Sequence, residues 1–332
     1  MAEGRVFSGM RPSGRLHLGN YFGALANWVN LQNQYDQCFF AVADVHALTT
    51  LQGKDQVAEI KPNTHEMVLD WLAAGMDPER AVLFVQSQVP EVLTLNSLLG
   101  MSTPLGWLMR VPTFKEKVRQ MGADEEHIPY GLVGYPVLQT ADVILYKADR
   151  VPVGKDQVPH IEIMREIARR FNHLYGDTFP EPQALLTETP LVAGTDGVAK
   201  MSKSLDNQIE LAADAEETSK RVKRMVTDPQ RQRKTDPGRP EVCNVYSLHK
   251  IFNPGKLEEI HHQCTTAGIG CVDDKQTLAD GINTYLADFR ERRQELAAKP
   301  GYVNEVLASG AARASAVARE TIREVYGKMG LT

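Results

Sequence analysis

The chain of 332 residues has few of the features that mark membrane, secreted or P-loop proteins. Its apolar runs all fall short of the roughly 20 residues that cross a bilayer. The N-terminus shows no basic region followed by an apolar stretch, so we expect no signal peptide. Its four cysteines do not make the pattern of a secreted disulfide framework. The sequence Gly-x-x-x-x-Gly-Lys-Ser/Thr is absent, which excludes a P-loop enzyme. We expect a cytoplasmic protein with no membrane partner.

The composition, with 42% hydrophobic and 24% charged residues, is that of a soluble globular protein. A formal net charge of −5 argues neither for nor against a nucleic-acid partner, because a local basic patch on an acidic chain still binds phosphate. The length favours two domains of about 100–200 residues each.

Buried strands and helices alternate through the first part of the chain. Short apolar runs at residues 4–9, 38–43 and 81–85 predict buried strands, and helical spacing follows at 21–31 and 56–72. This alternation predicts an α/β fold with a doubly wound parallel sheet. Ligands of such sheets bind beyond the carboxyl ends of the strands, where residues 7–9, 44–46 and 86–88 fall.

The character of the sequence changes after residue 204. Apolar segments at 141–146 and 151–153 and a helix at 161–171 still belong to the first part. From residue 212 on, the pattern is helical with almost no strand signal, and residues 303–329 predict one long helix. We expect a first domain at residues 1–205 and an α-helical domain at residues 206–332.

Residues 12–20 (Pro-Ser-Gly-Arg-Leu-His-Leu-Gly-Asn) follow the first predicted strand directly. Gly19 lets the backbone approach a ligand, and a helix starting near Asn20 directs free N–H groups toward an anion. His17 can donate to a phosphate oxygen. An ordinary strand-to-helix turn with a surface histidine is the alternative that this segment alone leaves open.

Residues 200–204 (Lys-Met-Ser-Lys-Ser) set two ammonium groups among hydroxyls on a predicted loop. By itself this segment also fits a solvated loop. Two such lysines can neutralise the charge that develops on a leaving pyrophosphate. Together the two segments suit a site that holds a nucleoside triphosphate from both ends while its α-phosphate is attacked.

Both segments resemble the signatures of class I aminoacyl-tRNA synthetases, and the second matches the family sequence letter for letter. Further blocks, covering nearly the whole chain, narrow the resemblance to the bacterial tryptophanyl-tRNA synthetases. These blocks are residues 7–9 (Phe-Ser-Gly), 19–21 (Gly-Asn-Tyr), 44–49 (Asp-Val-His-Ala-Leu-Thr), 114–117 (Phe-Lys-Glu-Lys), 135–142 (Tyr-Pro-Val-Leu-Gln-Thr-Ala-Asp) and 151–157 (Val-Pro-Val-Gly-Lys-Asp-Gln).

The resemblance implies a Rossmann-type catalytic domain and a helical domain that includes the anticodon-binding region. It implies ATP-dependent activation of L-tryptophan to tryptophanyl-adenylate, assisted by Mg²⁺, and transfer to tRNA(Trp) by a homodimer. The aspartate that matches Asp142 accepts the indole N–H of tryptophan in this family. The resemblance assigns the other tryptophan-binding positions to Phe7, His46, Tyr135, Gln139, Val151, Val153 and Gln157.

The same resemblance assigns the catalytic and ATP-binding residues and no residue that binds a metal. Catalytic positions are His17, Asn20, Lys117, Lys200 and Lys203. The ATP-binding positions are Arg11, Pro12, Ser13, His17, Gly19, Asn20, Gly154, Lys155, Asp156, Val192, Lys200, Met201, Ser202, Lys203 and Ser204.

Some residues depart from the family pattern. Asn20 replaces the second histidine of the general signature, as is common in the tryptophan branch, and Gln139 stands where many bacterial relatives have methionine. Arg11 replaces a frequent glutamine, and Lys155 replaces a frequent glutamate. The last two add positive charge near the expected ATP.

Cys243, Cys264 and Cys271 resemble a motif that holds an iron–sulfur cluster in some members. Such clusters are usually held by four thiolates, but the fourth position here is Asp274. Isolated cysteines are more often small buried side chains. We therefore predict that no cluster is bound.

The densest basic stretch contains Lys220, Arg221, Lys223 and Arg224. A solvated helix face is the ordinary interpretation of a charge run. Because tRNA passes near the helical domain in the family, we expect these side chains to contact tRNA phosphate.

Alternative functions remain open from the sequence. A tyrosyl-tRNA synthetase shares the fold and both signatures. A small-metabolite adenylyltransferase shares the first signature but lacks the complete second one and the helical domain. A synthetase paralogue with a binding or regulatory role is the third alternative.

Overall fold

The computed structural model describes residues 2–121, 127–186 and 192–331. Its central element is a parallel sheet whose strands lie in the order β3-β2-β1-β4-β5. In the described residues the strands are β1 (Ala2–Met10), β2 (Tyr35–Val42), β3 (Ala81–Val85), β4 (Arg150–Val153) and β5 (Gln183–Leu186). This order confirms the predicted doubly wound α/β fold.

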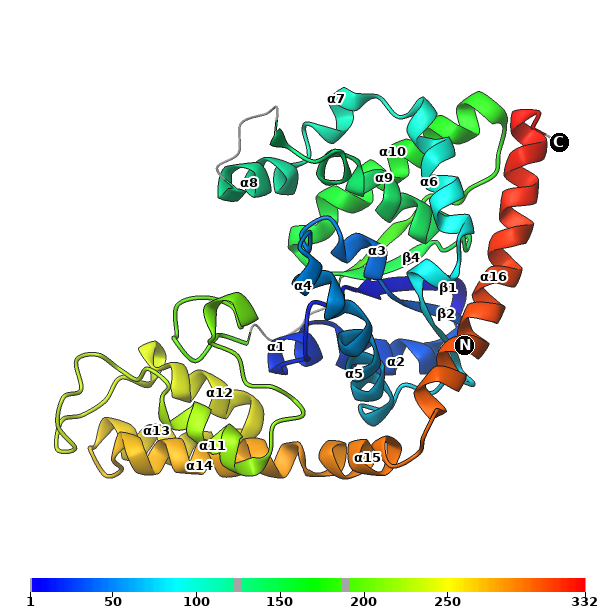
Figure 1. Cartoon of the computed structure of the whole chain (residues 1–332). Coiled ribbons are helices and arrows are strands. Elements are labelled where there is room, and N and C mark those ends of the chain that lie inside the picture. The colour runs from blue at the N-terminus through cyan, green and yellow to red at the C-terminus, as the bar shows by residue number, and fades with distance from the viewer. Residues whose placement is uncertain (1, 122–126, 187–191, 332) are drawn as a thin grey trace.

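Helices cover both faces of this sheet (Figure 1). Every residue of β3 is buried, as expected of a strand enclosed on both sides. The helical elements of this part are α1 (Leu18–Asn20), η1 (Tyr21–Leu25), α2 (Ala26–Gln34), α3 (Asp44–Ala47), α4 (Lys54–Ala58), α5 (Ile60–Ala73), η2 (Gln86–Gln88), α6 (Glu91–Ser102), α7 (Leu105–Leu108), α8 (Pro112–Met121), α9 (Tyr130–Ile144), η4 (Lys155–Gln157) and α10 (Val158–Tyr175).

In two predicted segments, the apolar pattern did not show the secondary structure that the residues adopt. The helix expected near Asn20 begins at Leu18 and passes through a π-helical turn, Tyr21–Leu25, before α2. Such turns are frequent near functional sites. The apolar segment at residues 141–146, which carries Asp142, begins within the last turn of α9.

The rest of the chain is helical, and its first helices form a group to one side of the sheet (Figure 1). Its elements are η5 (Lys203–Leu205), α11 (Ala215–Lys223), η6 (Pro240–Val242), α12 (Asn244–Phe252), η7 (Pro254–Lys256), α13 (Leu257–Thr265), α14 (Cys271–Tyr285), α15 (Ala287–Ala297) and α16 (Tyr302–Met329). The helical C-terminal region is confirmed, and the domain boundary at residue 206 stays a prediction.

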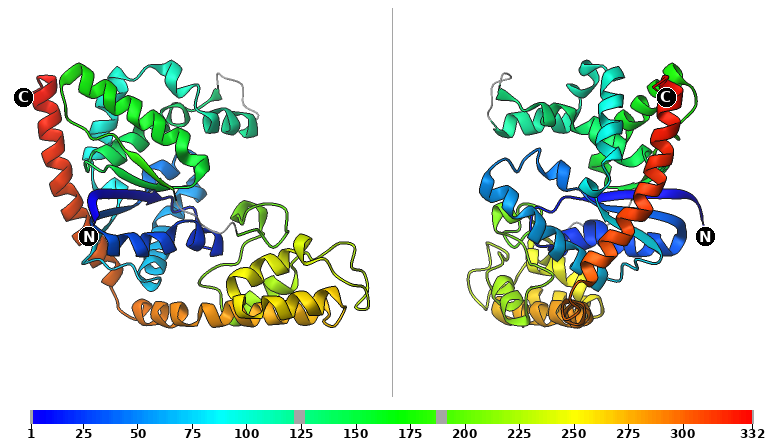
Figure 2. Two further views of the ribbon diagram at one scale, coloured as in Figure 1. Left: turned by 180° about the vertical axis from the view of Figure 1, so that it is seen from behind. Right: turned by 45° about the vertical axis from the view of Figure 1, so that its right-hand side comes forward.

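The last helix returns to the sheet. In the left view of Figure 2, α15 runs away from the α11–α14 group, and α16 then lies along the sheet. Gly310 permits this approach, because a Cβ there would lie 1.8 Å from the backbone oxygen of Leu83 in β3. Among the described residues, no helix combines the length and apolarity needed to cross a membrane.

Candidate functional site

Two adjoining cavities open beyond the carboxyl ends of β1 and β4, where the strand order reverses. Their volumes are about 640 Å³ and about 500 Å³. Both are lined by Met10, Arg11, Gly23, Gly154 and Gln157. A ligand in one cavity can therefore meet a ligand in the other along this shared wall.

The first cavity collects most of the residues predicted to bind ATP. Both signature segments line it, and backbone hydrogen bonds join residues 16–18 to residues 209–211, which follow the second segment (Leu18 N to Ile209 O, 3.0 Å; Leu211 N to Leu16 O, 3.0 Å). The predicted residues that line it are Arg11, Ser13, His17, Gly19, Asn20, Gly154, Asp156, Val192, Lys200, Met201, Ser202 and Lys203.

Four predicted residues are not shown at this cavity. Pro12 and Lys155 do not line it, and Lys155 is exposed in η4. Lys117 is part of α8, but its side chain and that of Ser204 lie outside the described residues. The roles of these four residues stay predictions, as do the roles of the residues that line the cavity.

His17 caps α1 at the floor of the first cavity. The Asn20 side chain accepts a hydrogen bond from the His17 backbone N–H (3.1 Å), which fixes the turn. Burial, together with the nearby charge of Lys203, lowers the pKa of His17 to about 4. The imidazole is therefore neutral at pH 7. Its Nδ1 is buried without a hydrogen-bond partner in the described structure, as expected of a group that meets a ligand.

Lys203 extends over Gly14, whose φ of +127° favours glycine. A Cβ at Gly14 would lie 2.6 Å from Lys203 Nζ, so Gly14 leaves room for this side chain. Burial lowers the pKa of Lys203 to about 8, with opposing contributions from Glu210 and Asp70. The ammonium is thus held ready for an anion but is close to losing its proton at mildly alkaline pH.

The loop that carries Lys200 and Lys203 is held by Asn207, which the sequence analysis did not identify. Asn207 Oδ1 accepts from the Ser202 backbone N–H (2.7 Å), and its Nδ2 donates to Asp196 (2.8 Å) and to the Lys200 carbonyl (3.2 Å). Its place three residues after the signature is the only sequence signal.

The second cavity is lined by every residue predicted to bind tryptophan, from Phe7 to Gln157. Asp142 is 5% exposed, and its Oδ2 lies 2.8 Å from His46 Nε2. Tyr135 Oη lies 3.0 Å from Nε2 of His160, which also lines the cavity. The cavity thus joins an apolar wall to a buried carboxylate, which suits a flat ring with one N–H or O–H donor.

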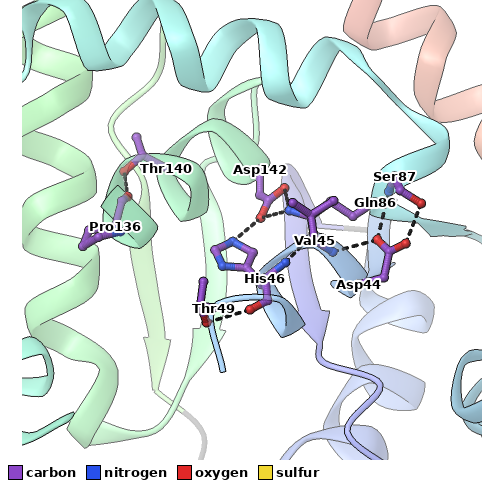
Figure 3. A network of polar contacts seen from close by, with 9 residues as sticks. All are labelled: Asp44, Val45, His46, Thr49, Gln86, Ser87, Pro136, Thr140 and Asp142. Atoms are coloured by element: carbon purple, nitrogen blue, oxygen red, sulfur yellow. Dashed lines mark hydrogen bonds and ion pairs between the residues drawn. The ribbon is translucent and has the colours of Figure 1, made fainter. Parts of the chain in front are cut away.

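Two residues whose side chains lie within hydrogen-bond distance of Asp142 or Tyr135 were not assigned from the sequence. His160 is one, and Gln86 is the other, with its Nε2 2.7 Å from Asp142 Oδ1 (Figure 3). Gln86 directly follows β3, where a ligand was expected, so this position was the available sequence signal. His160 gave none.

Two of the four positions of the cluster motif, Cys264 and Asp274, contact other protein side chains. Arg231 Nη1 lies 3.7 Å from Cys264 Sγ, and its Nη2 donates to the Ile269 carbonyl at 2.6 Å. Asp274 pairs with His249 through Oδ1 and Nε2 (3.1 Å). The fourth position of the motif is thus a carboxylate paired with a histidine, which does not match a cluster held by four thiolates.

We therefore predict that protein purified without oxygen contains no iron and no acid-labile sulfide. Colorimetric assay of both, on freshly purified protein, is the measurement. Stoichiometric iron and sulfide, lost in Cys264→Ser, would contradict this prediction.

The residues predicted to contact tRNA lie on or next to α11. Lys220 pairs with Glu216 (2.6 Å) and Arg221 pairs with Asp206 (2.7 Å). Lys223 and Arg224 are exposed. Lys223 and Arg224 are therefore better placed than Lys220 and Arg221 to bind an external phosphate.

The sheet, the two cavities and the signature segments define a class I synthetase of the Rossmann type. The model of the family "tRNA synthetases class I (W and Y)" matches residues 2–287, and the chain belongs to this family. Relatives named tryptophan–tRNA ligase are similar over nearly their whole length. The relative from Thermotoga maritima is 46% identical, and the match covers 98% of this chain and 99% of the relative. The relative from Treponema pallidum is 45% identical, and the match covers 99% of this chain and 97% of the relative.

A solved structure agrees with these relatives. The tryptophanyl-tRNA synthetase from Campylobacter jejuni, complexed with ADP and tryptophan, has a TM-score of 0.87 and 37% sequence identity to this chain. The match covers 98% of this chain and 99% of that one.

Proposed function

We propose that this protein activates L-tryptophan with ATP and transfers the tryptophanyl group to tRNA(Trp). The observation that carries the proposal is the pair of adjoining cavities, one between the two signature segments and one built around the buried Asp142. The full-length similarity to tryptophan–tRNA ligases supports it.

In the activation step, a carboxylate oxygen of tryptophan attacks the α-phosphorus of ATP. The P–O bond to pyrophosphate breaks, and tryptophanyl-adenylate forms. Positioning and charge stabilisation supply the catalysis, without a covalent protein nucleophile. The shared wall of the two cavities lets the tryptophan carboxylate reach the α-phosphate. Mg²⁺ enters with ATP as the metal–nucleotide substrate.

The first signature segment supplies a hydrogen-bond donor to the phosphates, and the second supplies positive charge. The neutral His17 donates to a phosphate oxygen, while Lys200 and Lys203 stabilise the negative charge that grows on pyrophosphate. In the second cavity, the indole N–H donates to Asp142, with Phe7 and Val151 against the ring. Tyr135, Gln139 and Gln157 hold the amino-acid end.

The proposal extends to tRNA and to assembly. Lys223 and Arg224 contact tRNA phosphate, with the helical region at 206–332 carrying the anticodon-binding part. The protein acts as a homodimer in the cytoplasm, where its tRNA substrate is found. The large apolar side chains that are exposed on or beside α6, α7 and α9 support a dimer: Leu93, Met101, Leu105, Met109 and Tyr130.

ATP–pyrophosphate exchange tests the proposal, with tryptophan and tyrosine as alternative amino acids. We expect exchange with tryptophan alone, and a loss of about 10³-fold or more in kcat/KM for tryptophan in Asp142→Ala, because a site built around a polar partner depends strongly on it. Exposed Asp177 gives a matched control, Asp177→Ala, that should leave exchange unchanged.

Other results of the exchange assay would support the alternative functions. Exchange with tyrosine would move the assignment to tyrosyl-tRNA synthetase. Folded protein that binds tryptophan but shows no exchange would indicate a paralogue with a binding or regulatory role.

A further inference from the structure

Gln86 lies behind the second cavity, in the turn η2 that ends β3. Its side chain is buried, with 1% of its surface exposed, and it is not among the residues that line the cavity. Its Nε2 lies 2.7 Å from Oδ1 and 2.9 Å from Oδ2 of Asp142. The amide therefore contacts both oxygens of the carboxylate from outside the cavity that the carboxylate faces.

The orientation of this amide is determined by its other end. Gln86 Oε1 accepts hydrogen bonds from the backbone N–H groups of Val45 (3.1 Å) and His46 (3.2 Å), in the first turn of α3 (Figure 3). A flipped amide would set its oxygen against the Asp142 carboxylate and its NH₂ against two N–H donors. Only the orientation with NH₂ toward Asp142 pairs every group.

A second contact holds the same two turns together. Asp44 Oδ1 accepts from the Ser87 backbone N–H (3.0 Å), and Asp44 Oδ2 accepts from the Ser87 hydroxyl (2.5 Å). The turn after β2 and the turn after β3 are thus joined twice, by Gln86 and by Asp44. This makes Gln86 a rigid support rather than a mobile surface amide.

We propose that Gln86 is a positioning residue for tryptophan selection, which orients the Asp142 carboxylate so that it offers an acceptor to the indole N–H. This rests on the proposed function, since it refines the role given there to Asp142. A carboxylate has about four acceptor directions. Gln86 binds both oxygens from outside, and His46 Nε2 binds Oδ2 at the cavity wall (2.8 Å). With these directions occupied, a remaining lone pair of Oδ1 is directed at the ligand.

Gln86→Met and Gln86→Glu separate this role from simple support of α3. The glutamate keeps an oxygen for the N–H groups of Val45 and His46 but sets a like charge against Asp142 in place of a donor. The methionine removes both interactions. Gln88→Glu is the matched control, because Gln88 is exposed in the same turn.

The measurement is kcat/KM in ATP–pyrophosphate exchange for L-tryptophan and for L-3-benzothienylalanine, in which sulfur replaces the ring N–H. The readout is the ratio of the two values. We expect this ratio to fall about tenfold or more in both Gln86 variants, mainly through tryptophan, and to stay within about twofold in Gln88→Glu. Thermal unfolding of each variant confirms that the comparison is between folded proteins.

Equal losses for both amino acids in Gln86→Glu, with an unchanged ratio, would overturn the inference and leave Gln86 a structural residue. That outcome differs from failure of the proposed function. If the unsubstituted protein does not prefer tryptophan over the sulfur analogue, or if Asp142→Ala keeps that preference, the role of Asp142 itself is wrong.

Discussion

Replacing Lys203 by alanine is expected to lower kcat for tryptophan-dependent ATP–pyrophosphate exchange by about 10²- to 10³-fold. Removing one preorganised donor from the site of developing charge has an effect of this size. Lys203 is half-buried beside Gly14 and faces the cavity between the signature segments. Lys256→Ala serves as the control, because Lys256 is exposed in η7 and does not line that cavity. A loss of the same size in Lys256→Ala would contradict this assignment of roles.

The pH dependence gives an independent check on Lys203. Burial lowers its pKa to about 8, so the ammonium is present below pH 8 and is lost as the pH rises through that value. Because kcat/KM for ATP reports the free enzyme, it should fall above pH 8. Lys203→Arg keeps its charge at every accessible pH, so this fall should disappear while the absolute rate drops. If kcat/KM for ATP falls with the same midpoint pH in Lys203→Arg, a group other than Lys203 is titrating.

The sequence predicted the site better than it predicted the contacts that hold the site. His17 and Lys203 lie far apart in the chain, yet their segments are recognisable alone and the sheet topology brings them to one cavity. Asp142 was likewise placed by its block, although its helix was not predicted. The resemblance supplied these assignments, and composition or periodicity alone would have left each segment ambiguous.

The supporting residues could not be predicted because their partners are distant in sequence. Gln86 meets Asp142 across 56 positions, and nothing in a glutamine at a strand end specifies that pairing. Asp70 and Arg293 are separated by 223 positions and meet only because α15 packs on α5. Such pairs follow from the packing of whole helices, which a local pattern does not determine.

Arg293→Met is expected to lower the free energy of unfolding by about 3–5 kcal/mol, because it leaves a buried carboxylate without its partner. Asp70 is 1% exposed, and its Oδ1 lies 2.7 Å from Arg293 Nε, while Arg293 Nη2 reaches Glu66 at 2.5 Å. Urea unfolding at pH 7.5 measures the loss. Arg292→Met, at the exposed neighbouring position, is the matched control and should change stability by less than about 0.5 kcal/mol.

The pH dependence of this loss identifies its cause. Burial raises the pKa of Asp70 to about 6, against the opposing effect of Arg293. A carboxyl whose pKa is higher in the folded than in the unfolded state stabilises the fold at low pH, and this contribution is lost as the pH rises through the folded value. Without Arg293 the folded pKa rises further. The deficit of Arg293→Met should therefore be largest above pH 7 and should shrink toward pH 5.

The double variant Asp70→Leu with Arg293→Met separates the unpaired charge from lost packing. An apolar pair of similar volume often replaces a buried ion pair with little change in stability. We expect the double variant to recover most of the stability lost in Arg293→Met and to lose the pH dependence of the deficit. If the double variant is as unstable as the single one at every pH, then α15 is held to α5 by the stem of Arg293 and not by its charge.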